Sequence, residues 1–183
     1  MNTFKITFRI FALCGVLFFL SSFVGFENGD FETPGTLTFI GDAGSPNLFT
    51  FNRWSIESAD LPDGDFTNVK AEIVIDAGSF SADWKDLENS IRKKKDYFYV
   101  KKFPKASVKI NGATLNDDGS YSTEASVTLK GKTKKVDLHF TVSETAPYQI
   151  VGGGVIQRRQ FGFSGDGPKD EVPVNFDFTF PTE

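Results

Sequence analysis

The sequence predicts an all-β fold, an eight-stranded antiparallel barrel with one short helix, and three observations support it. Turn-forming residues recur from Gly35 onward at the spacing typical of short strands. Between these turns apolar and polar residues alternate, so each strand has one dry face and one wet face. The chain also contains 21 Phe among 183 residues, which suits a β structure whose interior is filled by rings.

Residues 1–25 are predicted to be an export signal peptide, which leaves 26–183 as one barrel domain. Lys5 and Arg9 give a positive start, and the apolar run 10–20 has the length of a signal sequence rather than of a membrane span. We therefore expect a periplasmic or secreted protein, with an uncleaved anchor as the alternative. Cys14, the single cysteine, lies in this segment, so the mature chain would form no disulfide.

Eight strands are expected, at 36–40, 48–57, 68–77, 105–113, 120–130, 134–142, 148–162 and 171–181. The dry faces are clearest in four of them, which carry Val69, Ala71, Ile73 and Ile75; Ala106, Val108 and Ile110; Val136, Leu138, Phe140 and Val142; and Val172, Val174, Phe176, Phe178 and Phe180. Phe49 and Phe51 are out of phase with Trp54 and Ile56, which predicts a bulge near 52–53. Three glycines at 152–154 predict a sharp bend at a barrel corner.

One connection, 78–104, is much longer than the others and is predicted to cover the open end of the barrel. Trp84, Leu87 and Ile91 follow at i, i+3 and i+7, which places them on one face of a short helix. Asp83 is a suitable N-cap, and the lysines at 93–95 would complement the C-terminal end of the helix dipole.

The barrel is expected to enclose an empty volume. An eight-stranded barrel is just wide enough to be filled by side chains or to hold one small ligand. Several inward positions carry small side chains, namely Ala71, Ala106, Thr123 and Ala125, which favours a cavity. The alternative is that the phenylalanine rings fill the space.

Charges are expected to separate between the two rims. Up-and-down topology brings nine lysines to the rim that carries the long connection: Lys93, Lys94, Lys95, Lys101, Lys102, Lys130, Lys132, Lys134 and Lys135. The opposite rim would collect Glu57, Asp60, Asp63, Asp65, Asp117, Asp118 and Glu144. The lysines either only keep the rim soluble, or they attract anionic head groups and membrane surfaces. The net charge of −4 argues against a general nucleic-acid binder.

Three segments resemble the YceI-like family in the same order along the chain. Residues 96–104 resemble its "DFF…ekyP" segment, and residues 129–136 resemble its hairpin through Gly131, Thr133 and Val136. Residues 156–162 resemble its "R-x-D-F-G" strand through Arg158, Phe161 and Gly162. The family's early histidine has no counterpart, and Gln160 replaces the usual Asp. The resemblance implies an exported, lipocalin-like barrel that binds polyisoprenoids or similar lipids in its interior.

The predicted function is an exported, non-catalytic binding protein that holds a long-chain apolar ligand (a polyisoprenoid, quinone-like or fatty-acyl lipid) for storage or transport. The alternative is a structural or interaction module with a filled core that docks a partner or an anionic membrane through its lysine-rich rim. No cofactor, metal or catalytic residue is predicted, because His139, the single histidine, alternates to the wet face. The predicted ligand-binding residues are Ile73, Ile75, Trp84, Leu87, Ile91, Tyr97, Phe98, Phe103, Val108, Val127, Leu138, Phe140, Arg158 and Phe161.

Overall fold

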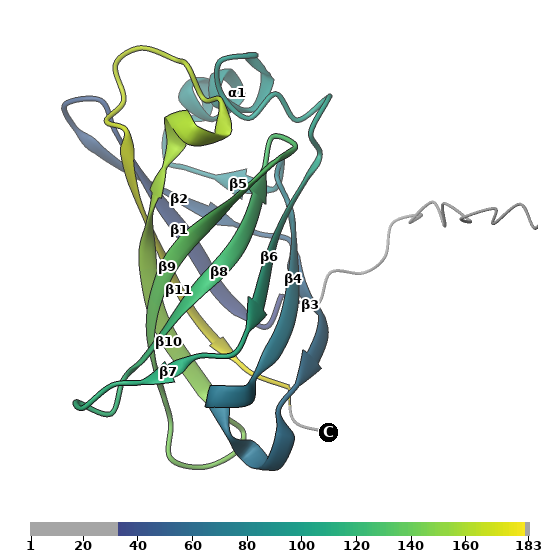
Figure 1. The fold of residues 1–183 in the computed structure, drawn as a ribbon. Helices are drawn as coiled ribbons and strands as arrows, with labels where there is room; N and C mark the ends of the chain where they lie inside the picture. Colours follow the sequence, from purple (N-terminus) through teal and green to yellow (C-terminus); the bar gives the residue numbers. More distant parts are fainter. Residues whose placement is uncertain (1–32, 182–183) are drawn as a thin grey trace, which may run out of the picture. The chain divides into compact units, whose positions relative to one another are not determined.

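Eleven strands of one antiparallel sheet make up most of the described chain (Figure 1). The computed structural model describes residues 33–181, so the predicted signal peptide at 1–25 lies outside the described residues. The strands are β1 Gly35–Asp42, β2 Pro46–Phe51, β3 Trp54–Asp60, β4 Lys70–Asp76, β5 Phe80–Ser81, β6 Lys105–Asn111, β7 Thr114–Leu115, β8 Tyr121–Leu129, β9 Lys132–Val142, β10 Gln149–Gln157 and β11 Glu171–Thr179.

The sheet curls into a barrel that is closed by one bent segment. The hydrogen-bonded order runs β3-β4-β6-β8-β9-β10-β11-β1-β2-β5, with β7 added to β8. The strands β2 and β3 are successive halves of the same segment, and they pair with β1 and β4 respectively. The antiparallel pairs therefore run round the barrel and return to where they began. The predicted fold class is confirmed.

The strand count differs from the prediction because one predicted strand divides and two short strands appear. The expected strand 48–57 is interrupted at Asn52 and Arg53, where the predicted bulge lies. Phe49, Phe51 and Trp54 are all buried, so the interruption restores the inward phase across it. A second register shift occurs between Ile56 and Ser58 in β3. The added strands β5 and β7 have two residues each.

The glycines at 152–154, where a sharp bend was predicted, lie within a continuous strand ladder. β10 pairs continuously with β11 through all three of them, and with β9 as well. A Cβ on Gly152 would lie 2.3 Å from the His139 carbonyl oxygen, and one on Gly154 would lie 2.6 Å from that of Asp137. The glycines therefore allow the neighbouring backbones to approach closely in the sheet.

β10 ends earlier than predicted, at Gln157, and a short 3-10 helix, η3 (Arg158–Phe161), follows it. Gly162 ends η3 in the left-handed conformation, with φ of 82°. Glycine adopts this conformation without steric cost, which explains why the chain turns there.

The long connection contains the one α-helix of residues 33–181, α1 (Lys85–Lys93). Its N-cap is Trp84, which provides no side-chain hydrogen bond, so the predicted capping role of Asp83 is wrong. Glu88 secures the helix instead, because its carboxylate accepts hydrogen bonds from the Ala82 amide and the Lys85 ammonium. Its other oxygen lies 3.0 Å from the Arg92 guanidinium. These bonds lower the pKa of Glu88, the Lys85 contact most strongly.

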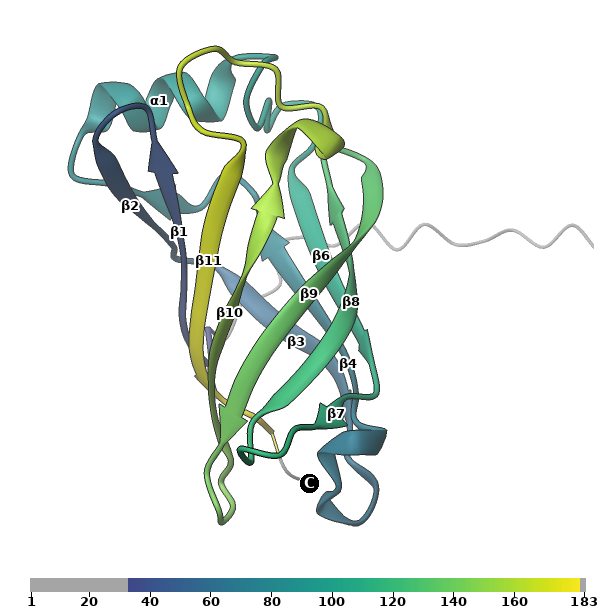
Figure 2. The ribbon, with the colours of Figure 1, turned by 60° about the vertical axis from the view of Figure 1, so that its left-hand side comes forward.

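The two ends of the barrel carry different connections (Figure 2). One end, called the α1 end, holds α1, the β1–β2 turn, the β8–β9 turn and the segment 158–170. The opposite end holds β7, the β9–β10 loop and two 3-10 turns, η1 (Pro62–Gly64) and η2 (Phe66–Asn68). The predicted position of the long connection, over one end of the barrel, agrees with this arrangement.

Candidate functional site

The barrel encloses a cavity of about 200 Å³. Its wall is formed by the inward side chains of the strands, because alternation turns every second residue toward the axis. The aromatic part of the wall consists of Phe39, Phe49, Phe51, Trp54, Phe66, Tyr97, Phe98, Phe140, Phe163, Phe176, Phe178 and Phe180. Ala71 and Ala106 also line it, as expected of small residues that leave space. Thr123 and Ala125, which were expected to contribute, are buried but do not reach the cavity.

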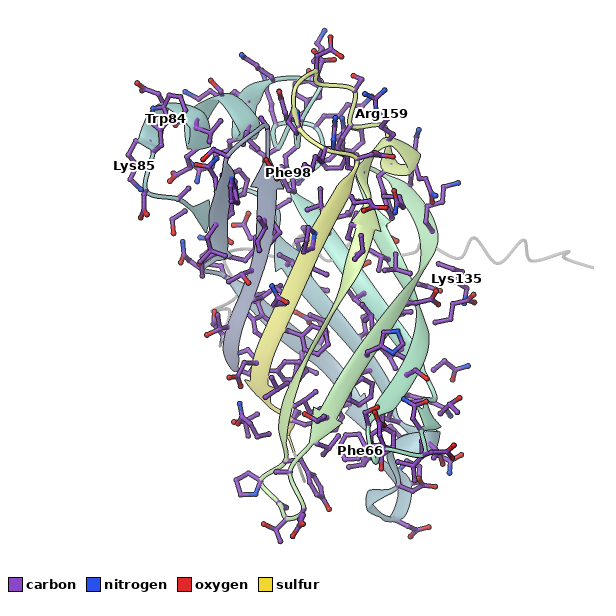
Figure 3. The ribbon with its side chains drawn as sticks, turned by 90° about the vertical axis from the view of Figure 1, so that its left-hand side faces the viewer. Phe66, Trp84, Lys85, Phe98, Lys135 and Arg159 are labelled. Atoms are coloured by element: carbon purple, nitrogen blue, oxygen red, sulfur yellow. The ribbon has the colours of Figure 1, made fainter. Side chains whose placement is uncertain are left out.

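Phe98 covers the cavity at the α1 end. Its ring lies 5.1 Å from the ring of Phe80, 5.6 Å from that of Phe39 and 5.1 Å from that of Phe163. Figure 3 shows Phe98 beneath the helix and directed toward the strands. Aromatic pairs at these separations attract one another through edge and face contacts, so the cover is a packed cluster of rings.

The long connection is joined to the segment 158–170 across this end. The Asp96 carbonyl accepts hydrogen bonds from the amides of Ser164 and Gly165, and the Asp96 carboxylate accepts one from the Ser164 hydroxyl. The Tyr97 ring lies over Gly165, where an added Cβ would be 2.4 Å from the ring. A larger residue at 165 would therefore displace the Tyr97 ring from this position over the cavity.

A second group of rings closes the opposite end. Phe66 in η2 lies 5.8 Å from Tyr121, 5.3 Å from Tyr148 and 5.7 Å from Phe180, measured between ring centroids. Figure 3 shows Phe66 inside this end of the barrel. An aromatic cluster therefore lies at each end of the cavity.

Arg158 is the one charged side chain on the cavity wall among residues 33–181. It is buried, and its guanidinium donates to three backbone carbonyls, those of Lys169 at 2.8 Å, Phe163 at 3.3 Å and Pro168 at 2.6 Å. These bonds offset part of the cost of burying a charge and hold η3 against the residues that follow it, 163–169. Trp54 also lines the cavity, and its indole nitrogen is buried without a hydrogen-bond partner.

Ten of the fourteen predicted ligand-binding residues line the cavity. They come from four strands, α1, η3 and the connection after α1: Ile73, Ile75, Ile91, Tyr97, Phe98, Val108, Val127, Leu138, Phe140 and Arg158. Contact of these residues with a ligand stays a prediction.

The other four predicted residues do not reach the cavity. Trp84 is 60% exposed and lies outside the barrel, at the start of α1 (Figure 3). Leu87 is partly buried and packs against the hydrophobic core. Phe161 is buried in a second hydrophobic cluster with Ala125 and Leu138. Phe103 packs on the β8–β9 turn, where its ring is 3.2 Å from the position of a Cβ on Gly131. These four residues are apolar like the cavity wall, but their side chains lie outside the barrel or pack elsewhere in the protein.

The aromatic wall residues of β1, β2 and β11 were not among the predicted ligand-binding residues. Alternation had already placed Phe176, Phe178 and Phe180 on a dry face, so a signal for them was present in the sequence. Phe66 has no such signal because it belongs to a 3-10 turn without strand periodicity.

Most of the lysines that were expected at one rim belong to the α1 end. Six of the nine lysines belong to the long connection or the β8–β9 turn at the α1 end, whereas Lys132, Lys134 and Lys135 lie within β9. Lys135 lies on the outer wall, 3.2 Å from Glu124 (Figure 3). Lys130 donates to the carbonyls of Lys95 and Gly162, and its burial lowers the pKa of its ammonium group.

Within residues 33–181 no group of three or more His, Cys, Asp or Glu side chains is placed to hold a metal ion. His139 points away from the interior and is exposed on β9. In the same residues no helix has the length and apolar character needed to cross a membrane.

Several solved structures have a fold similar to that of this chain. Burkholderia cenocepacia BcnA shares 21% identity and a TM-score of 0.72, over 80% of this chain and 96% of the other. A Campylobacter jejuni YCEI protein shares 18% and 0.64, over 74% and 84%. A polyisoprenoid binding domain from Saccharophagus degradans shares 16% and 0.60, over 80% and 94%.

The curated proteins gave no match. The YceI-like domain matches residues 20–180, which is most of the chain and includes every described strand. The chain therefore belongs to the YceI-like family.

Proposed function

We propose that this protein is an exported, non-catalytic carrier that holds one long-chain apolar ligand inside its barrel, for storage or transport. The observation that carries the proposal is the cavity of about 200 Å³ with an almost wholly apolar wall. An engineered cavity of about 150 Å³ lined by Leu, Ile and Phe stays dry and binds benzene. A cavity of this kind therefore favours a ligand without exposed polar groups along its length.

The energetics suit reversible binding. Each buried CH₂ contributes about 0.8 kcal/mol, so a chain of about fifteen carbons contributes roughly 12 kcal/mol. Association costs an estimated 4–15 kcal/mol in lost freedom, which leaves a moderate net affinity. A carrier needs such an affinity because it must also release its ligand.

The ligand class is a polyisoprenoid, a quinone-like lipid or a fatty-acyl lipid. A fold-related domain from Saccharophagus degradans is described as polyisoprenoid binding, which supports this class. The proposal includes a periplasmic or secreted location, supported by the signal-like residues 1–25.

The alternative, a structural or interaction module with a filled core, requires no internal space. The cavity counts against it, because a void without a ligand forfeits contacts that a solid core would make. The lysines of the α1 end still suit a transient contact with an anionic membrane surface, which a lipid carrier also needs.

Native mass spectrometry after mild purification tests the proposal. We expect a bound hydrophobic molecule, and we expect delipidated protein to take up geranylgeraniol or palmitate but not a short-chain alcohol. The short alcohol is the matched control for geranylgeraniol, because it offers the same hydroxyl group without the buried carbons. A protein that is isolated bare and takes up neither long-chain compound would contradict the proposal.

A further inference from the structure

We propose that the α1 end docks on an anionic lipid bilayer, with Trp84 and Leu48 inserted among the head groups. This inference rests on the proposed function, because a lipid carrier must collect or deliver its ligand at a membrane. The inference assigns a role to Trp84, whose side chain does not line the cavity.

Trp84 is placed in an unusual way for a large aromatic residue. It is 60% exposed, although rings of this size are usually well buried. It also occupies the N-cap of α1, where it makes no side-chain hydrogen bond and where Ser, Thr, Asp or Asn is preferred. A residue that breaks a local rule without a packing gain indicates a function outside the fold itself.

Leu48 provides a second exposed apolar side chain on the same side. It is 57% exposed and belongs to β2, which pairs with β5 through Thr50 and Ser81. Because this pair is antiparallel, Leu48 and Trp84 both lie beyond it in the same direction, toward the α1 end. The two exposed apolar side chains therefore lie toward the same end of the barrel, and the pair is here called the Trp84 edge.

The basic side chains of the long connection favour an anionic partner, and most of them lie at the end of α1 or after it, at 93–95 and 101–102, rather than flanking Trp84. The long connection 78–104 carries seven Lys and Arg residues against four Asp and Glu, although the whole chain has a net charge of −4. Lysines near a membrane surface are attracted by anionic lipids, and tryptophan prefers the interface between water and hydrocarbon. Opposite charge and an insertable ring together fit the surface of an anionic bilayer.

Docking in this orientation brings the cavity cover to the membrane. Phe98 and Tyr97 cover the cavity at the same end, and they belong to the same long connection as Trp84 and α1. A ligand that leaves the cavity past these rings would enter the bilayer without crossing water.

A vesicle co-sedimentation assay tests the inference with the purified protein, using phosphatidylcholine vesicles with and without phosphatidylserine. We expect binding to the anionic vesicles only, weakened by high salt, and a blue shift of tryptophan emission on binding. Trp84→Ala should reduce vesicle binding about tenfold, the loss of roughly one buried side chain. Leu115→Ala is the matched control, because Leu115 is 53% exposed on β7 at the opposite end and should change nothing.

Uptake of geranylgeraniol without vesicles separates this inference from the proposed function. Trp84→Ala should take up the compound as the wild type does, because Trp84 does not line the cavity. The docking inference is overturned if the wild type does not bind anionic vesicles or binds neutral vesicles equally well. It is also overturned if the Trp84→Ala variant binds anionic vesicles as strongly as the wild type. If the wild type takes up no geranylgeraniol, the carrier function is rejected instead.

Discussion

Filling the cavity from within should abolish ligand binding without unfolding the protein. Ala71 lies on β4 with its side chain on the cavity wall, so Ala71→Phe would place a phenyl ring in the empty space. The ring would exclude about six ligand carbons, which at about 0.8 kcal/mol each amounts to roughly 5 kcal/mol. At 1.4 kcal/mol for each tenfold, the Kd should rise by more than about a thousandfold.

The same substitution should leave stability unchanged or raise it, because the ring gains contacts in a void rather than displacing packed atoms. Binding is measured by displacement of a fluorescent fatty acid, and stability by thermal unfolding followed by circular dichroism. Val151→Phe is the control, because Val151 is 46% exposed on the outer face of β10. Unchanged affinity in Ala71→Phe, with its fold intact, would refute the view that the ligand occupies the barrel interior.

Two further substitutions test how the fold is held. Gly152→Ala should lower the Tm by about 4–8 °C, since its Cβ would lie 2.3 Å from the His139 carbonyl oxygen and overpacking costs about 2 kcal/mol. Gly78→Ala, whose Cβ would be 3.4 Å from its nearest neighbour, should have little effect, and equal losses would contradict this reasoning. Glu88→Gln should reduce stability at neutral pH, because the Lys85 contact lowers the pKa of Glu88 below its ordinary value of 4.5. A lowered pKa stabilises the fold above pH 4.5 and less so as the pH falls, so the difference from wild type should shrink in urea titrations at acidic pH.

Trp84 shows where helical periodicity fails as a guide to burial. Its spacing to Leu87 and Ile91 predicts one shared face, and Leu87 and Ile91 do pack on the core. Trp84 lies before the first turn of α1, where the backbone is extended, so the helical spacing does not orient its side chain. The terminal residue of a short helix is thus the least reliable member of an apolar face.

The sequence by itself determined the all-β barrel, the inward face of most strands and the phase change at 52–53. These features follow from alternation and turn residues, which act over a few neighbouring positions and can be read along the chain. Only the tertiary structure decided which apolar residues enclose the cavity. Phe103 packs on the β8–β9 turn, whereas Phe98 packs against Phe39, Phe80 and Phe163, although both are phenylalanines of the same connection. Such contacts join residues far apart in the chain, so they depend on how the closed barrel brings its strands and loops together.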